Sequence, residues 1–97
     1  MLEYLIRRTD GEWFVFPYGQ YPEILRPIRI PAKHIEGWGS HRIEVEGEEI
    51  SFSDEDPGFQ IGFETGKLRE ERADQIVAEI CENIEAKTGQ LTRIVKL

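Results

Sequence analysis

The stretch of residues 33–41 holds the side chains best suited to chemistry. It contains His34, Glu36 and His41, so two imidazoles and a carboxylate lie within eight positions. Such groups bind a divalent metal ion, or serve as acid and base in a hydrolysis. Their spacing matches neither the His-x-x-x-His pair of a helical zinc site nor the His-x-His pair of a strand site. We expect surface histidines without a metal, and a metal site or a small hydrolase centre is the alternative.

Trp38 lies between Gly37 and Gly39 in the same stretch. A tryptophan on a flexible loop either plugs the end of a sheet or anchors a protein partner. We expect the plug, and the anchor is the alternative. Tyr18 and Tyr21, which precede this stretch, are the other aromatic residues that we expect a partner to contact.

Three further patterns that carry chemistry in other proteins are incomplete. Residues 54–58 begin like a calcium loop, but Thr65 stands at the twelfth position, where the loop needs an acid. Cys81 is the one cysteine, which excludes an internal disulfide and a multi-cysteine zinc module, and its apolar neighbours indicate a core residue. The sequence has no Ser-His-Asp order and no phosphate-binding glycine loop. We therefore expect no cofactor and no catalytic residue.

Acidic side chains are concentrated in the middle of the chain, whose formal net charge is −7. The segment of residues 44–64 has no Lys or Arg and eight acids, which are Glu44, Glu46, Glu48, Glu49, Asp54, Glu55, Asp56 and Glu64. Such a segment repels phosphate backbones, so we expect no nucleic-acid partner. It attracts a basic protein and speeds the encounter. The alternative is that it only keeps exposed strands soluble.

The segment of residues 42–65 alternates apolar and polar side chains with the period of two that indicates β-strands. We expect three antiparallel strands, with turns at Glu46-Gly47 and at residues 54–58. The apolar face comprises Ile43, Val45, Ile50, Phe52, Phe59, Ile61 and Phe63. The polar face comprises Arg42, Glu44, Glu46, Glu49, Ser51, Ser53, Gln60, Gly62 and Glu64. The pattern thus predicts an acidic sheet face.

Shorter patterns predict the elements that precede this sheet. Residues 2–8 and 12–18 are β-branched and aromatic runs joined by an Asp-Gly turn, which predicts a hairpin. Residues 13–16 are apolar on both alternating faces, so we expect this strand to be central. Residues 28–30 predict an edge strand between prolines, and residues 32–37 predict one helical turn.

One long helix and a last strand are predicted at the end of the chain. Residues 67–88 repeat apolar side chains at three-four spacing, which indicates an amphipathic helix with Gly89 as its C-cap. Residues 93–96 predict a short strand that returns to the sheet. The predicted fold class is α+β: a single domain with an antiparallel meander sheet of about six or seven strands and one long helix packed on its apolar face.

Parts of the C-terminal half resemble small uncharacterised bacterial domains of a sheet-plus-helix type. The similar residues are 50–53, 56–61, 63–64, 80–85 and 88–90. Some compact domains of this kind are immunity proteins, which neutralise a toxin by covering its basic catalytic groove. The resemblance implies a small acidic protein without an active site, and it carries over no site residue.

The sequence as a whole predicts a non-enzymatic protein-binding domain, with a toxin-neutralising immunity protein as its specific form. The residues expected to contact a basic partner are Glu44, Glu46, Glu49, Glu64, Trp38, Tyr18 and Tyr21. A structural homodimer, formed through residues 13–16 or through an exposed sheet edge, is a further alternative. The chain has no apolar run of membrane-spanning length and no signal-peptide pattern, so we expect a cytoplasmic protein with no membrane partner.

Overall fold

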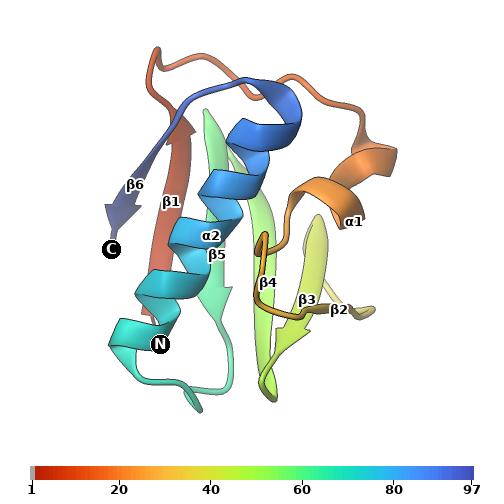
Figure 1. Cartoon of the computed structure of the whole chain (residues 1–97), viewed down its shortest axis with the longest axis vertical. Helices are drawn as coiled ribbons and strands as arrows, with labels where there is room; N and C mark the ends of the chain where they lie inside the picture. Colours follow the sequence, from red (N-terminus) through yellow and green to blue (C-terminus); the bar gives the residue numbers. More distant parts are fainter. Residues whose placement is uncertain (1) are drawn as a thin grey trace.

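The computed structural model describes residues 2–97, and it shows an open antiparallel sheet with one long helix across one of its faces (Figure 1). The strands are β1 (Leu2–Arg8), β2 (Lys33–His34), β3 (His41–Val45), β4 (Glu48–Glu55), β5 (Gly58–Phe63) and β6 (Thr92–Lys96). The helical elements are the long α2 (Glu70–Thr88) and two short neighbours, η1 (Tyr18–Gln20) and α1 (Tyr21–Ile24). The predicted α+β fold is confirmed, with six strands in the sheet.

The strand order across the sheet is β2-β3-β4-β5-β1-β6. The first four strands of this order follow one another in the chain and form a meander. Strand β1 pairs with β5 along one edge and with β6 along the other, so it lies inside the sheet. In Figure 1 the N-terminal β1 and the C-terminal β6 accordingly lie next to each other. The edge strands are β2 and β6.

The three strands predicted between residues 42 and 65 are confirmed as β3, β4 and β5. The seven apolar side chains assigned to their inner face are all buried, namely Ile43, Val45, Ile50, Phe52, Phe59, Ile61 and Phe63. A two-residue turn joins β3 to β4, and its Glu46 and Gly47 both have positive φ angles, 53° and 82°. Such a turn follows the twist of the strands that it joins and fixes their register.

Helix α2 lies over this inner face and buries its apolar stripe against the sheet. The stripe comprises Ala73, Ile76, Val77, Ile80, Cys81 and Ile84. Desolvation by burial raises the pKa of the Cys81 thiol to about 11, so the thiol stays protonated and packs as a core residue. The predicted C-cap is confirmed, because Gly89 has a left-handed φ of 73° and its amide donates to the Glu85 carbonyl oxygen. Within residues 2–97 no helix has the length and apolar character needed to span a membrane.

Helix α2 begins at Glu70, three residues later than the pattern predicts. The reason is Glu48, whose side chain is fully buried. Its carboxylate accepts hydrogen bonds from the backbone amides of Thr65, at 2.7 Å, and Lys67, at 3.0 Å. Desolvation alone would raise the pKa of Glu48, but these bonds outweigh it and hold the pKa below its ordinary value. The charged carboxylate therefore fixes residues 65–67 as a loop.

The predicted N-terminal hairpin is wrong, because residues 12–18 form no second strand. Both edges of β1 are taken by β5 and β6, so no edge is left for another strand. The segment is a loop that closes one end of the core. The rings of Phe14 and Phe16 stack on a phenylalanine of β5, with centroids 5.6 and 5.9 Å apart, while Trp13 and Val15 are largely exposed. The pattern that predicted a central strand therefore belongs to a covering loop.

Two other local predictions are also wrong. Residues 28–30 form no strand, because the amides of Arg29 and Ile30 donate to the Glu79 carboxylate of α2, at 2.8 and 3.0 Å. Residues 32–37 form no helical turn, because their central part pairs with β3 as the edge strand β2. In both segments a pairing partner outside the segment decides the backbone conformation.

Candidate functional site

The sheet face opposite α2, which we call the open face, carries most charged side chains of the strands. Paired residues on neighbouring strands point to the same side, so they form rows across the sheet. The first row comprises Lys33, Glu44, Glu49 and Glu64, and the second comprises Arg42, Ser51, Gly62 and Glu3. The third row comprises Ser53, Gln60, Leu5 and Val95, and the last comprises Glu55, Gly58, Arg7 and Arg93.

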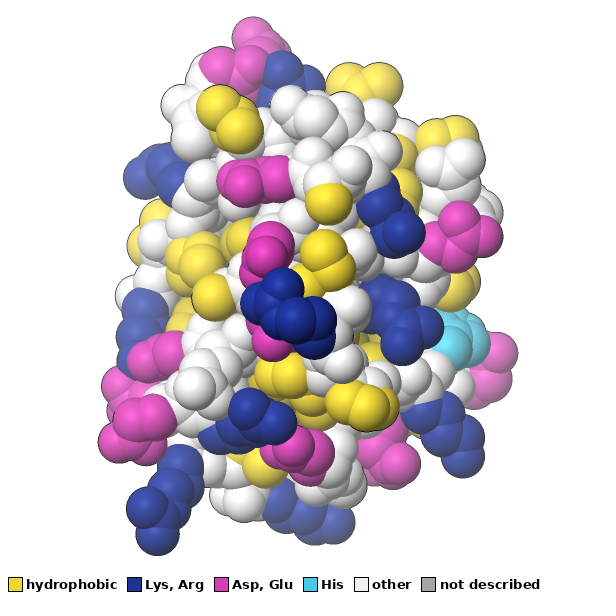
Figure 2. Space-filling view, in the orientation of Figure 1, with side chains coloured by type: hydrophobic (Ala, Val, Ile, Leu, Met, Phe, Trp, Pro, Cys, Tyr) yellow, Lys and Arg dark blue, Asp and Glu magenta, His cyan; other side chains and the backbone are white. Residues whose placement is uncertain are grey.

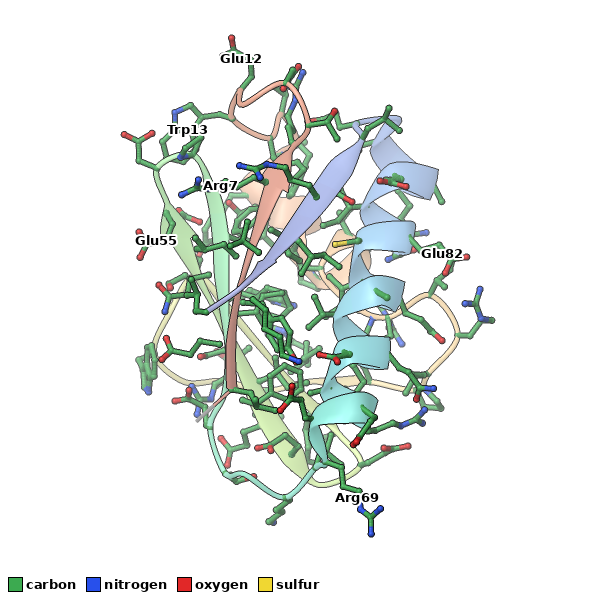
Figure 3. The ribbon with its side chains drawn as sticks, turned by 90° about the vertical axis from the view of Figure 1, so that its left-hand side faces the viewer. Arg7, Glu12, Trp13, Glu55, Arg69 and Glu82 are labelled. Carbon is green, nitrogen blue, oxygen red and sulfur yellow. The ribbon has the colours of Figure 1, made fainter. Side chains whose placement is uncertain are left out.

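The two ends of the open face carry opposite charge. The first row has three carboxylates and one lysine, Glu3 adds a carboxylate to the second row, and the third row is uncharged. The last row has Arg7 and Arg93 directly opposite each other, with Glu55 two strands away. Figure 3 shows that Arg7 and Glu55 both project from the sheet on the side away from α2. The open face is therefore acidic at one end and basic at the other, and not acidic throughout.

Three of the four glutamates predicted to contact a partner lie on the open face. The exception is Glu46, which lies in the turn between β3 and β4, where its carboxylate accepts from the Arg72 guanidinium at 2.6 and 3.0 Å. These bonds hold the pKa of Glu46 below its ordinary value. Because Arg72 belongs to α2, the predicted place of Glu46 on the sheet face is wrong. Basic and acidic side chains are interspersed on this α2 side of the molecule (Figure 2).

Arg42 is a buried cation at the acidic end of the open face, with 8% of its surface exposed. Its Nε and Nη2 donate to the Glu49 carboxylate at 3.2 and 3.0 Å, and Glu64 lies 3.9 Å from Nη2. Its third nitrogen, Nη1, is buried and has no hydrogen-bond partner within residues 2–97. The Trp38 ring lies over the guanidinium, with its centroid 5.3 Å from Cζ. The aromatic face attracts the charge that hydrogen bonds leave unmatched.

The backbone on both sides of Trp38 packs closely against β3 and β4. A Cβ at Gly37 would lie 2.5 Å from Cδ of Arg42, and a Cβ at Gly39 would lie 2.8 Å from the Phe52 carbonyl oxygen. Gly39 also has a φ of 100°, which few other residues adopt. The Trp38 residue is nevertheless 63% exposed, so the expected plug of the sheet end is wrong. Trp38 is instead an exposed ring on a closely packed backbone, with the Arg42 guanidinium against one of its faces, and this position suits an anchor.

A hollow of about 270 Å³ lies beside Trp38 on the open face, and we call it the Trp38 trough. It is lined by Glu3, Trp38, Ser51, Ser53, Gln60, Gly62 and Glu64. Its floor is low because the small Ser51 and Gly62 stand between Arg42 and Glu3 in one row. The Ser51 hydroxyl donates to the Glu64 carboxylate at 3.2 Å, and Gln60 donates to Glu3. An aromatic wall beside two carboxylates favours a cationic ligand.

A larger cavity of about 430 Å³ lies on another side of the loop that carries Trp38, and we call it the histidine cavity. It brings together the other predicted residues, which are Tyr18, Tyr21, His34, Glu36 and His41. The two imidazole rings stack with their centroids 5.2 Å apart. Nε2 of His41 donates to the Leu25 carbonyl oxygen at 3.0 Å. Desolvation by burial lowers the pKa of His41 to about 4, so its ring is neutral at neutral pH.

The histidine cavity does not assemble the metal or hydrolase centre that is the alternative from sequence. Nε2 of His34 lies 3.7 Å from the Glu36 carboxylate, whereas Nε2 of His41 is directed to a backbone carbonyl. Across residues 2–97, no three His, Cys, Asp or Glu side chains are placed to hold a metal ion together. A ring with a pKa of about 4 is also a weak base at neutral pH. In this arrangement Nε2 of His41 is engaged by the backbone and is not free to act as a ligand or a base.

The predicted anchors lie at two different places. Tyr18 and Tyr21 line the histidine cavity, whereas Trp38 lines the trough. The Tyr18 hydroxyl donates to the Ser40 carbonyl oxygen at 2.9 Å, and its ring lies 4.5 Å from the Tyr21 ring. Desolvation, with Asp54 nearby, raises the pKa of Tyr21 to about 12. Both tyrosines thus belong to the cavity wall, and Trp38 is the one predicted aromatic anchor on the open face.

Sequence reasoning missed the charged residues on the far side of the trough. Glu3 and Arg7 come from β1 and Arg93 from β6, and no local pattern reveals that β1 pairs with β5 and that β6 pairs with β1. The available signal is the alternation of residues 2–8. It puts Glu3 and Arg7 on one face and the buried Tyr4 on the other.

Comparisons of the chain with protein-family models, with curated proteins and with solved structures gave no match. The resemblance to immunity proteins therefore stays a prediction. The function has to be argued from the chemistry of the open face.

Proposed function

We propose that this chain is a non-enzymatic binding domain that takes a lysine or arginine side chain of a protein partner into the Trp38 trough. The observation that carries the proposal is the position of Trp38. Its ring is largely exposed, contacts Arg42, and lines the same hollow as the carboxylates of Glu3 and Glu64, on a backbone that packs closely against the sheet. An aromatic ring that is already fixed loses little conformational freedom on binding, so more of its contact energy appears as affinity.

The charges around the trough favour a cation over an anion. Arg42 is engaged by Glu49 and covered by Trp38, so it offers little to an incoming anion. An ammonium or guanidinium group that lies on the outer face of Trp38 can reach the carboxylates of the trough. Each such contact is worth only about 0.5–1 kcal/mol at an exposed site. One side chain therefore binds weakly, and tight binding needs further contacts.

The acidic first row supports the same proposal at longer range. Glu44 and Glu49 lie beside the trough, and the whole chain has a formal net charge of −7. Such a field attracts a basic protein and raises its association rate, most strongly at low ionic strength. Replacing Glu44 and Glu49, which do not line the trough, should slow association more than it changes dissociation.

Toxin neutralisation is the specific form of this function that we propose. The basic catalytic groove of a toxin presents the lysine and arginine side chains that the trough and the acidic first row would accept. Small size, negative charge and a preformed anchor support this form. A homodimer or a solubility role for the acidic residues would instead leave the trough empty when basic proteins are added.

A fluorescence titration tests the trough directly. The chain has two tryptophans, so Trp13→Phe leaves Trp38 as the one reporter. The probe is acetyl-arginine amide, and acetyl-citrulline amide is its uncharged counterpart of nearly the same shape. We expect the arginine probe to change the Trp38 emission with a Kd of roughly 10–100 mM, because one ring contact and two carboxylate contacts together contribute no more than about 3 kcal/mol. We expect the citrulline probe to cause a much smaller change.

A matched pair of variants gives the control. Glu3→Gln with Glu64→Gln removes both trough carboxylates, and we expect it to weaken the arginine probe about fivefold or more. Glu12→Gln with Glu71→Gln removes the same charge from exposed positions off the trough and should leave the Kd unchanged. Equal responses to the two probes, or equal losses in the two variants, would contradict a cation site at Trp38.

A further inference from the structure

Arg7 and Arg93, at the basic end of the open face, take no part in binding a cation in the Trp38 trough. Arg7 and Arg93 are directly opposite each other on β1 and β6. Within residues 2–97, neither side chain forms an ion pair. Like charges directly opposite in a sheet repel each other. No carboxylate of the described residues therefore neutralises either charge, and Arg93 is open to solvent.

The surroundings of Arg7 show where a compensating group would lie. A Cβ at Gly58 would lie 3.2 Å from Cγ of Arg7, so the arginine stem rests on the sheet over this glycine. Its Nε is buried and has no hydrogen-bond partner within residues 2–97. Glu55 stands beyond Gly58 on the same face but forms no ion pair with either arginine in this part of the chain. Because that Nε is buried, an external acceptor placed between the two arginines would receive hydrogen bonds from their terminal nitrogens.

We propose that Arg7 and Arg93 bind a carboxylate of the same partner whose basic side chain occupies the Trp38 trough. This inference rests on the proposed function, and it adds that the partner presents two opposite charges at a fixed spacing. Guanidinium groups pair with carboxylates through two parallel hydrogen bonds, which adds geometric specificity to the charge. The partner surface is thus itself divided, with a Lys or Arg at one end and an Asp or Glu at the other.

The spacing follows from strand β1, which carries residues of both ends. Glu3 lines the trough and Arg7 belongs to the basic end, and they are four residues apart in one strand. At about 3.3 Å per residue, this separation is roughly 13 Å. In an extended partner segment laid along β1, residues i and i+4 span the same distance and point to the same side. The segment between them would cover the uncharged third row, where Leu5 and Val95 are half-buried.

Two other occupants explain less of the open face. A free phosphate ion would pair with the two arginines, but it would not occupy the trough, and it would not account for the spacing between the trough and the arginines. A second copy stacked face to face would also bring an acidic end over a basic end, and it would make the binding signal depend on protein concentration. A partner segment with two charges accounts for the trough, the arginines and the uncharged row between them.

Two short capped peptides test the inference, with the Trp13→Phe protein at low ionic strength. The first has arginine and, four residues later, glutamate, with small polar residues elsewhere. The second has glutamine in place of that glutamate. We expect the first peptide to bind about three- to fivefold more tightly, read from the Trp38 emission and from backbone amide shifts in β1 and β6. The difference should disappear at high salt.

Variants assign the difference to the two arginines. Arg7→Gln with Arg93→Gln should make both peptides bind with the affinity of the glutamine peptide. Lys67→Gln with Arg69→Gln removes two exposed cations far from this end, as the position of Arg69 in Figure 3 shows, and should preserve the difference. This second pair controls for the change in net charge, and amide spectra report whether each variant is folded.

The outcomes separate the inference from the function on which it rests. If both peptides change the Trp38 emission with the same Kd, the cation site stands and the carboxylate site is wrong. If neither peptide affects Trp38, the proposed function fails as well. A Kd that varies with protein concentration, together with a dimer mass in light scattering, would overturn the inference in favour of a second copy on the open face.

Discussion

The two faces of the sheet differ in how they treat their polar groups. On the face that α2 covers, the Glu48 carboxylate accepts loop amides, and Asn83 and His41 donate to backbone carbonyls at the end of α1. On the open face lie the two buried side-chain nitrogens that lack a hydrogen-bond partner within residues 2–97, which are Nη1 of Arg42 and Nε of Arg7. The covered face is therefore satisfied by the chain itself, and the open face is not.

A buried polar group without a partner costs free energy, so its position is informative. One of the two nitrogens lies beneath Trp38 at the acidic end, and the other lies at the basic end beside Gly58. The two orphaned groups thus mark the two ends of the surface that we propose for the partner. The covered face thus supplies the stability of the fold, whereas the open face keeps buried arginines whose hydrogen-bonding capacity the chain does not fill.

The largest expected effect is a difference in the free energy of unfolding when a side chain is truncated on each of the two faces. Ile80 is fully buried under the sheet, and Ile80→Ala should lower the free energy of unfolding by about 3–4 kcal/mol. Val95→Ala removes a half-buried side chain from the open face and should cost about 1 kcal/mol or less. Urea unfolding followed by circular dichroism measures both changes. Similar losses in the two variants would mean that the open face is also part of the core.

The second effect is a pH dependence that arises on the covered face. Unfolded His41 takes up a proton near pH 6.5, whereas folded His41 does so only near pH 4. Protons therefore favour the unfolded chain between these values, and the stability falls as the pH drops from 6.5 to 4. The group accounts for a loss of up to about 3 kcal/mol across this range. His41→Gln should remove this part of the pH dependence, as urea unfolding at each pH would show.

The sequence predicts the half of the fold in which patterns are long and local. The alternation over residues 42–65 and the three-four spacing before Gly89 are set by burial on one face, so they survive in the structure. The segment of residues 12–37 was predicted wrongly because its conformation depends on distant partners. The strand predicted for residues 12–18 does not form, because β5 and β6 occupy both edges of β1. A strand order is not a local property of any segment.

The candidate site was predictable for the same half of the molecule. Trp38 was singled out by its two glycines, but whether its ring faces the core or the solvent depends on Arg42, which extends over the sheet from β3. Glu3 and Arg93 were missed because long-range pairing decides which strands lie next to β1 and β6 in the sheet. Glu46 was misplaced because the positive φ of the turn takes it out of the alternation.

The third effect tests how the loop holds Trp38. Gly39→Ala puts a Cβ against the Phe52 carbonyl oxygen at a φ of 100°, and we expect a loss of about 2 kcal/mol in stability. Gly66 has a φ of 68° with open space around it, so Gly66→Ala should cost about 1 kcal/mol from the backbone alone.

The two glycine variants also separate stability from binding. Gly39→Ala should weaken the arginine probe because it moves the ring of Trp38, whereas Gly66→Ala should leave the Kd unchanged. Equal Kd values for the two variants would show that the trough does not need a fixed ring.

The smallest expected effect concerns the basic end and has the opposite sign. Arg93→Gln removes the charge that faces Arg7 across β1 and β6, so it should raise the free energy of unfolding by roughly 0.2–1 kcal/mol at low salt. The gain should vanish at high ionic strength, since salt screens exposed charges. Arg69→Gln, which replaces an exposed arginine outside the sheet, should change the stability less.

A loss of stability in Arg93→Gln would mean that groups of the chain already stabilise this charge. The open face would then satisfy its charged groups as fully as the covered face does. A gain in stability together with weaker binding of the glutamate peptide would show that Arg93 lowers the stability of the free protein and contributes to binding of the carboxylate.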